Sequence, residues 1–311
     1  LGLRLTETKE NCKGESVVPQ ERKSYWNYIA GLLLFGSNGI VASGIALDSY
    51  KIVYLRCIIG ITVLLLLFLL TRQKRNVKGY ERDLCFLAIS GAAMGGNWLF
   101  LYEAYQQIGV GTASLLCYCG PVIVMVLAPI LFHEKLTLHK CLGFLVVLVG
   151  VFLINGQAAQ EGKTLWGLFC GGMSAVMYAV LVIANKKVTH IVGMENVLYQ
   201  LLFSTVTVAI FLLFREGLFF SIPADAWRFV LLLGVVNTGL GCYLYFSSIG
   251  RLSVQSVAVL GYLEPFSAVV LSAVLLREGM SLLRLLGVGC ILGGAMLAEM
   301  SGKKTRSSFS E

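Results

Sequence analysis

Three ionisable side chains lie inside long apolar stretches of this 311-residue chain: Arg56, Glu103 and Glu264. A charge in hydrocarbon is costly, so such residues are expected to pair with one another, line a substrate path or carry protons. Counted from the ends of their apolar runs, Arg56 and Glu103 fall at the same depth, which allows an ion pair between them. Two interpretations stay open for this pair: a salt bridge that packs two helices, or a group that couples ion and substrate movement.

Glu264 stands near the middle of its apolar run, directly before Pro265. Proline removes a backbone donor and disrupts the helical turn before it, so a freed carbonyl is expected beside this carboxyl. Glu264 therefore either lines a substrate path or is a protonated carboxyl that hydrogen-bonds between helices. In a path, it would also exchange a proton for a ligand.

Aromatic residues form a stripe on one helix face, because Trp98, Tyr102 and Tyr105 are spaced i, i+4, i+7. The stripe is either helix packing or the wall of a cavity. Aromatic rings beside a carboxylate suit a cationic or zwitterionic ligand. With one interior amide and tyrosines from neighbouring runs, the predicted site consists of Asn38, Trp98, Tyr102, Tyr118, Tyr243, Tyr262 and Glu264.

The elements that carry these residues are membrane helices. The chain is 57% hydrophobic and 14% charged, with a mean hydropathy of +0.79, which excludes a water-soluble monomer and a disordered chain. About 20 mostly apolar residues span a bilayer. Ten such runs occur, at 27–47, 51–71, 83–107, 111–132, 139–156, 165–185, 194–214, 227–249, 253–276 and 282–300. The sequence therefore predicts an all-α integral membrane protein with ten transmembrane helices.

The positive charges give the orientation. Of the 25 Lys and Arg residues, 18 fall on the side of both termini and 6 on the other, with Arg56 in the membrane. Cytoplasmic loops carry such an excess, so both termini are predicted in the cytoplasm. The net charge of +8 then reflects topology, and we expect the lipid bilayer as partner and no nucleic acid.

An internal repeat divides the chain into two halves. A shift of 144 residues superimposes Gly95 on Gly239, Val110 on Val254, Tyr118 on Tyr262, Pro121 on Pro265, Glu134 on Glu278, Gly143 on Gly287 and Gly150 on Gly294. Each half holds five helices, and an odd number inverts the second half in the membrane. Inverted repeats are the architecture of many secondary transporters. We predict a polar tail at 1–25, repeats at 26–156 and 164–300, and a second tail at 301–311.

At these residues the chain resembles the EamA family of the drug/metabolite transporter superfamily. The resemblance rests on Gly36-Ser37-Asn38, Arg56, Pro121 with Glu134, and Glu264-Pro265 with Glu278. It implies a ten-helix fold of two EamA repeats in a bacterial inner membrane. It also implies export or uptake of small metabolites, among them amino acids and amphipathic amines. The sixth helix departs from the family, with Ser174–Tyr178 in place of a Trp-Ala-x-Tyr pattern.

Together these features predict a secondary transporter that moves a small amino acid or amine-type metabolite by alternating access of the two repeats. A proton is a candidate coupling ion, and the matched prolines Pro121 and Pro265 are candidate gating residues. The nine cysteines lie mostly in apolar runs without a Cys-x-x-Cys pair, so we expect no metal and no cofactor. Phosphate-loop spacing is absent, which argues against nucleotide hydrolysis.

Two other functions remain open from the sequence: an integral membrane enzyme acting on lipid or acyl substrates, and a non-transporting membrane scaffold. The enzyme would need a polar catalytic cluster at one interface, whereas the histidines are isolated. For packing, we expect close helix contacts at Gly91-x-x-x-Gly95 and Gly289-x-x-x-Gly293. We also expect Glu134 and Glu278 to anchor helix termini beside Lys135 and Arg277.

Overall fold

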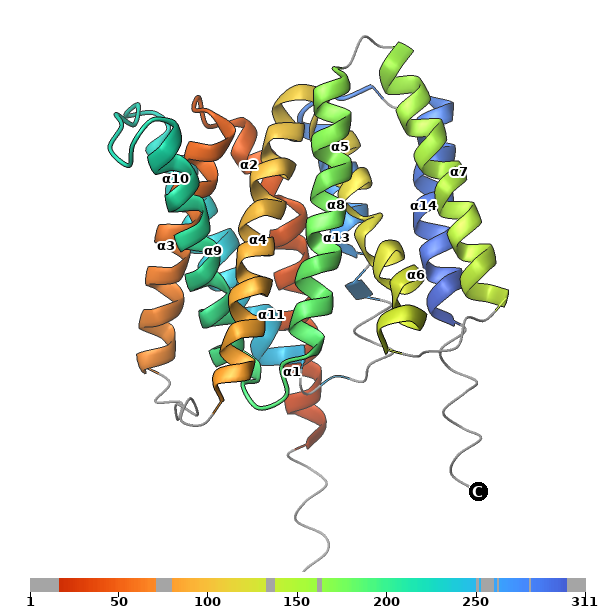
Figure 1. Ribbon diagram of the computed structural model, residues 1–311. Coiled ribbons are helices and arrows are strands. Elements are labelled where there is room, and N and C mark those ends of the chain that lie inside the picture. The colour runs from red at the N-terminus through yellow and green to blue at the C-terminus, as the bar shows by residue number, and fades with distance from the viewer. Residues whose placement is uncertain are drawn as a thin grey trace, which may run out of the picture.

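The computed structural model describes residues 17–70, 80–132, 138–160, 164–249, 252, 260–261, 263–279 and 281–300, and the regular structure of these residues is helical (Figure 1). The first half contains α1 (Val17–Gly36), α2 (Asn38–Ser43), α3 (Ser49–Leu70), α4 (Glu81–Ile108), α5 (Val110–Cys117), α6 (Gly120–Phe132) and α7 (Leu138–Gln160). The second half contains α8 (Leu165–Lys186), α9 (Gly193–Arg215), α10 (Trp227–Leu231), the π-helix η1 (Leu232–Leu240), α11 (Gly241–Ile249), α13 (Leu263–Leu275) and α14 (Leu282–Met300).

Every predicted apolar run carries helix, and the differences lie in how continuous each helix is. The first run is divided at Ser37, and the fourth is divided at Tyr118 and Cys119. The eighth run is helical throughout but changes to π-helix in its middle. The helix α1 begins at Val17 and so extends into the segment predicted as a polar tail.

Hydropathy agrees with a membrane setting. Among the residues that the structure describes, five helices are long and apolar enough to cross a bilayer, namely α3, α4, α8, α9 and the stretch Trp227–Tyr245, and four shorter apolar helices accompany them. Large apolar side chains point outward on several of them, including Leu70, Phe152 and Phe214, each more than three-quarters exposed. Such an apolar exterior fits hydrocarbon as its surroundings.

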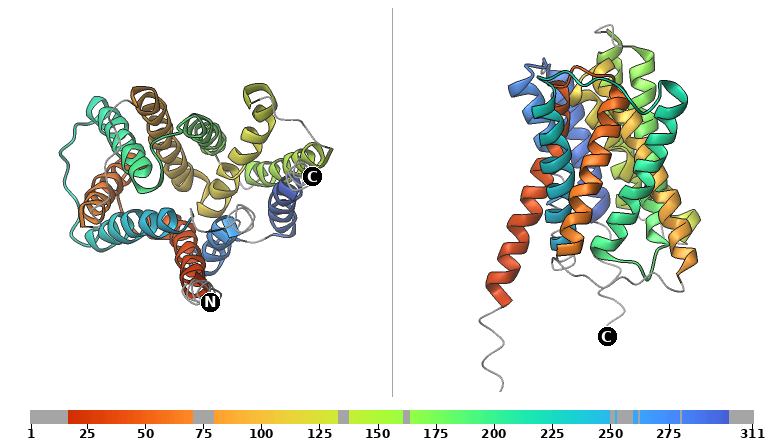
Figure 2. Two further views of the ribbon diagram at one scale, coloured as in Figure 1. Left: turned by 90° about the horizontal axis from the view of Figure 1, so that it is seen from below. Right: turned by 90° about the vertical axis from the view of Figure 1, so that its left-hand side faces the viewer.

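The helices run alternately up and down, and the order is reversed in the second half (Figures 1 and 2). We call the face where α1 begins and α14 ends the terminal side, and the opposite face the distal side. The helix α3 runs from the distal to the terminal side, whereas its repeat mate α9 runs from the terminal to the distal side. The two halves are therefore inverted relative to each other, as the odd number of helices predicts.

Helix packing repeats the same symmetry. The helix α4 packs on α8 and α9. Its repeat mate, the stretch formed by α10, η1 and α11, packs on α1 and α3, which are the repeat mates of α8 and α9. Glycines permit the close approach: a Cβ at Gly91 would meet the Gln200 carbonyl at 2.6 Å, and one at Gly95 would meet the Ser204 carbonyl at 3.0 Å. The predicted packing face of α4 is thus confirmed.

The symmetry mates α7 and α14 also cross closely, but not through the predicted face. A Cβ at Gly150 would meet the Gly287 carbonyl at 2.7 Å, and one at Gly294 would meet the Gly143 carbonyl at 2.7 Å. These four glycines are two matched pairs of the repeat. Gly289 and Gly293 are instead exposed, with nothing within 4 Å among the described residues, so their predicted packing role is wrong. Each step along a helix rotates the side-chain direction by about 100°. Gly289 is two residues from Gly287 and Gly293 is one residue from Gly294, so both face away from the contact.

Candidate functional site

Arg56 lies buried in the distal half of α3, where η1 approaches closely. The approach depends on small residues, because a Cβ at Gly60 would collide with the Thr238 methyl group. The Arg56 Nε donates to Thr238 Oγ1 at 3.2 Å. The Thr238 hydroxyl in turn donates to the Leu233 carbonyl at 2.8 Å, a five-residue step that suits the π-helix. The irregular helix therefore delivers a hydroxyl to a buried guanidinium.

The aromatic stripe of α4 forms the other wall around Arg56. Its guanidinium carbon lies 4.4 Å from the ring centre of Trp98 and 5.2 Å from that of Tyr102. One Nη also donates to the Tyr102 hydroxyl. Stacking on aromatic faces stabilises a desolvated guanidinium. The predicted stripe is thus a binding surface for a cation, and the cation that it holds here belongs to the protein.

Glu103 does not pair with Arg56 in the described structure. Its carboxylate accepts from Ser49 Oγ at 2.6 Å, from Gln107 Nε2 at 3.2 Å and from Trp166 Nε1 at 3.2 Å. Glu103 is one residue beyond Tyr102 and therefore faces about 100° away around the helix. Its carboxylate lies beside Ser49, the first residue of α3, and so nearer to the distal end than Arg56. Glu103 joins the distal ends of α3, α4 and α8, while Arg56 remains without an ion-pair partner among the described residues.

Glu264 lies in the first turn of α13, next to the turn between α5 and α6. Its carboxylate and the Tyr118 hydroxyl are hydrogen-bond partners. The backbone of the first turn of α13 approaches α1, since a Cβ at Gly36 would lie 2.8 Å from the Glu264 carbonyl. Arg56 is near enough to Glu264 to affect it electrostatically. The described interior therefore holds Arg56 as a fixed cation and Glu264 as a carboxyl.

The division between α1 and α2 faces the same region. The Leu34 carbonyl accepts from Ser37 Oγ at 2.8 Å and from Asn237 Nδ2 at 2.7 Å, and Asn237 also donates to Ser37 Oγ at 2.8 Å. These side chains take up an acceptor that would otherwise continue the helix. Asn38 follows the break, and its buried Oδ1 has no hydrogen-bond partner among the described residues. Most buried polar atoms in proteins have a hydrogen-bond partner, so Asn38 Oδ1 is an exception.

A pocket of about 270 Å³ opens on the distal side, between α2, α3, α4 and α5. Tyr102 and Tyr105 line it together with the backbone and side chains of Gly39, Ala42, Ser43, Ile45, Ile52, Gln106 and Val110. Tyr102 therefore separates this pocket from Arg56, with which it is hydrogen-bonded. A ligand in the pocket would reach the guanidinium if the Tyr102 ring moved.

The remaining predicted residues are placed as follows. Tyr243 packs with the apolar cluster around Leu64 and Phe68, towards the terminal side. Pro121 and Pro265 occupy matching places in the first turns of α6 and α13, and the division of the fourth run comes directly before Pro121. Tyr262 and Glu134 lie outside the described residues.

Thr238 was not predicted from the sequence as a site residue, and it reaches Arg56 from the π-helix η1. Its neighbour Asn237 is recognisable from the sequence as an interior polar group, because it interrupts the apolar run 227–249. Glu278 was predicted to anchor a helix terminus, and its carboxylate accepts from the backbone N–H groups of Val110 at 2.7 Å and Gly111 at 3.0 Å. The anchored terminus is that of α5, in the other repeat.

The family of the chain follows from these features together with sequence comparison. The EamA-like transporter family matches residues 23–156 and again residues 165–300. The chain belongs to this family. The two matches coincide with the two inverted halves of the fold, so the EamA-like chain is a multi-pass membrane transporter built from two copies of the family unit.

Relatives of this EamA-like chain are also transporters by name. It is 24% identical over 272 residues to the uncharacterized transporter YxxF of Bacillus subtilis, which covers 86% of this chain and 87% of that one. It is 29% identical to a probable terminal-alkyne amino-acid exporter of Streptantibioticus cattleyicolor, over 70% of this chain and 73% of that one. A crystal structure of another protein aligns with a TM-score of 0.63 over 89% of this chain and 98% of that chain, and at 18% identity it shows the shared fold.

Proposed function

We propose that this EamA-like transporter moves a small amphipathic metabolite with an amino group, most simply an amino acid, by alternating access of its two repeats. The observation that carries the proposal is the pair of opposite charges in the interior: the buried Arg56 guanidinium on α3 and the Glu264 carboxyl on α13. A zwitterion matches both, with its carboxylate towards Arg56 and its ammonium group towards Glu264. A relative named as an amino-acid exporter supports this class.

In this proposal the aromatic residues define the shape of the ligand. Trp98 and Tyr102 present ring faces beside Arg56, and Tyr118 holds Glu264. An apolar or aromatic ligand side chain would pack on these rings. Asn38 Oδ1 supplies an additional acceptor for the ligand's ammonium group, because it is the buried acceptor without a partner in the described structure.

Inversion of the two repeats supports alternating access, since repeat mates such as α3 and α9 run in opposite directions. The distal pocket above Tyr102 is the entry on one side. We propose that the segments following Pro121 and Pro265 move as the gates, because both prolines begin a helical segment next to the site. The excess of Lys and Arg on the terminal side supports a cytoplasmic position for both termini in a bacterial inner membrane.

Glu264 is the proposed proton carrier. A carboxyl that alternates between a ligand ammonium and a proton couples the two movements. The decisive experiment is counterflow of amino acids and amines in proteoliposomes, comparing the native chain with Glu264→Gln across pH. We expect the variant to lose transport of the amine-bearing ligand and to lose its pH dependence. Unchanged flux with unchanged pH dependence would assign Glu264 to packing. Absence of flux of any solute by the native chain would reject transport of these substrates.

A further inference from the structure

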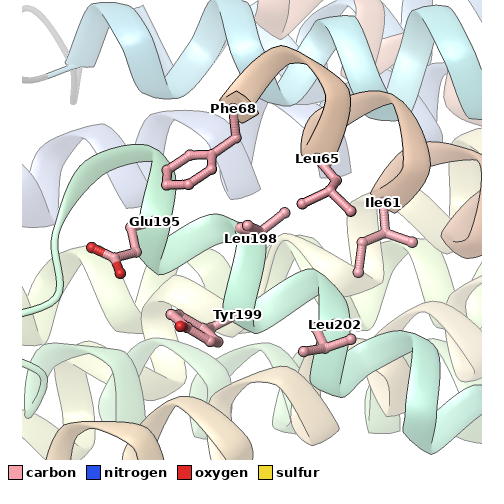
Figure 3. Close-up of a pocket in the computed structure, with 7 residues that line it drawn as sticks. All are labelled: Ile61, Leu65, Phe68, Glu195, Leu198, Tyr199 and Leu202. Atoms are coloured by element: carbon pink, nitrogen blue, oxygen red, sulfur yellow. The ribbon is translucent and has the colours of Figure 1, made fainter. Parts of the chain in front are cut away.

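A second pocket, of about 200 Å³, lies between the terminal-side halves of α3 and α9 and shares no lining residue with the distal pocket (Figure 3). It is lined by Ile61, Leu65 and Phe68 of α3 and by Glu195, Leu198, Tyr199 and Leu202 of α9. We call these seven residues the α3–α9 groove. The two helices are repeat mates and pack against each other.

The groove is amphipathic along its length. Glu195 is in the first turn of α9, and its carboxylate lies at the same end of the groove as the rings of Phe68 and Tyr199, whereas Ile61 and Leu202 form the other end (Figure 3). Leu202 is seven residues further along the helix than Glu195, which places it about 10 Å deeper in the membrane. The polar end is therefore at the membrane boundary and the apolar end is in the hydrocarbon.

The groove opens towards lipid. Leu65 and Leu202 line it and are 39% and 41% exposed. They continue into an apolar band on the same two helices, formed by Leu66, Leu69, Val206 and Ile210 among others. In a bilayer this band contacts lipid acyl chains, so an acyl chain that enters the groove stays in contact with the acyl chains of neighbouring lipids. The groove is polar at the membrane boundary and apolar in the hydrocarbon, as a phospholipid is.

The polar end of the groove carries a carboxylate. Glu195 is 7% exposed and lines the groove beside the rings of Phe68 and Tyr199 (Figure 3). A carboxylate with aromatic rings nearby favours an ammonium group. The 144-residue shift places Glu195 on Lys51, which at the distal end of the same helix pair lies 2.7 Å from Asp48 and 2.7 Å from Glu216. The repeat thus carries charges of opposite sign at the two ends of this pair.

From these observations we propose that the α3–α9 groove binds one aminophospholipid of the terminal-side leaflet. Its primary amine contacts the Glu195 carboxylate, and one acyl chain lies between Ile61 and Leu202. The site is separate from the interior charges assigned to transport, and its lipid supports the packing of the two repeat mates. A phospholipid with a trimethylated, choline-type headgroup has the same chains but cannot donate hydrogen bonds to Glu195.

Native mass spectrometry of the purified full chain tests this, with phosphatidylethanolamine and phosphatidylcholine of identical acyl chains as probes. The native chain should retain one phosphatidylethanolamine about tenfold more tightly than phosphatidylcholine. Glu195→Gln should remove that preference. The matched control is Glu81→Gln, an exposed carboxylate in the first turn of α4 on the same side, which should keep it.

A second variant tests the chain-binding end. Leu202→Trp fills the groove and should release both lipids. Glycerophosphoethanolamine, which has the headgroup without chains, should not compete. Equal retention of the two lipids by the native chain would overturn the proposal without any variant. So would a preference that survives both Glu195→Gln and Leu202→Trp, or displacement of the lipid by the free headgroup.

Discussion

The guanidinium of Arg56 lies 4.4 Å above the ring centre of Trp98, in the interior between α3 and α4. Tyr102, one turn further along α4, accepts a hydrogen bond from the same group. This arrangement fixes the position of a positive charge without neutralising it by a carboxylate on α4. The electric field of Arg56 is therefore available to an anionic group that enters the interior.

The planar shape of Arg56 should matter as much as its charge. Arg56→Lys keeps the charge but loses ring stacking and the fork that reaches Thr238 and Tyr102 together. We expect transport to fall at least about tenfold, which corresponds to about 1.4 kcal/mol. Counterflow in proteoliposomes measures this, with the exposed Arg82→Lys as control. Full activity of Arg56→Lys would remove the need for a stacked guanidinium.

Asn38 should show opposite effects on stability and transport. Its buried Oδ1 has no partner in the described structure, and such an acceptor costs about 1–3 kcal/mol. Asn38→Leu has a similar shape without polar atoms, so the melting temperature should stay equal or rise while transport falls. Thermal unfolding and flux of the same preparation check both. A lower melting temperature with full transport would place Asn38 in the scaffold.

Pro265 should affect movement more than folding. It lies in the first turn of α13, where proline fits without loss of a helical hydrogen bond. Pro265→Ala should therefore change the melting temperature little but change the transport rate, and Pro121→Ala should do the same as its symmetry mate. Rates from stopped-flow uptake, compared with unfolding curves, decide this. If both variants transport normally, gating does not depend on these prolines.

The crossing of α7 and α14 should tolerate no side chain at its contact glycines. Gly150→Ala and Gly294→Ala each place a Cβ 2.7 Å from a backbone carbonyl, which neither helix can avoid without moving apart. We expect a loss of about 1–3 kcal/mol of unfolding free energy from each. Gly289→Ala on the exposed face is the matched control and should be neutral or stabilising. Equal melting temperatures for all three variants would contradict the contact.

Acid sensitivity at the distal end should depend on Lys51. Its hydrogen bonds hold the pKa of the Asp48 and Glu216 carboxyls below their ordinary values of 3.8 and 4.5. A lowered pKa in the folded state adds stability above the ordinary value, and this stability is lost as the pH falls through the lowered one. Lys51→Met should reduce that loss below about pH 4. Both carboxylates are about half exposed, so the effect is small.

Melting temperatures between about pH 3 and about pH 6 measure this effect. Lys187→Met, an exposed lysine on the terminal side, serves as control. Identical pH profiles for Lys51→Met and the native chain would show that the distal ion pairs add nothing to folding.

The helical runs were predictable from the sequence, but the direction in which each side chain points around its helix was not. The apolar runs place Arg56, Glu103 and Trp98 on helices, as the structure has them. Periodicity alone did not show that Arg56 would meet Tyr102 while Glu103 would reach Ser49 and Trp166 at the distal ends of α3 and α8. The same gap explains the glycines of α14, where several residues of one type share a helix and only the partner helix determines which one is the contact.

Irregular backbone was the other limit. Apolar composition predicts a helix at 227–249 but not the change to π-helix within it, because hydropathy is similar for both. The change turns Thr238 towards Arg56 and Asn237 towards Ser37. Polar residues that interrupt an apolar run are expected to find partners, and identifying those partners requires the packing of the two repeats against each other.

The glycine crossing between α7 and α14 also bears on the origin of the chain. Gly150 meets Gly287 and Gly294 meets Gly143, so each partner uses the same two positions of its own repeat. A contact of this kind is isologous, the form that joins two identical subunits about a two-fold axis. Two separate copies of one five-helix ancestor, inserted in opposite directions, would already pair through it. Gene duplication and fusion then needed only to join the partners of an existing homodimer.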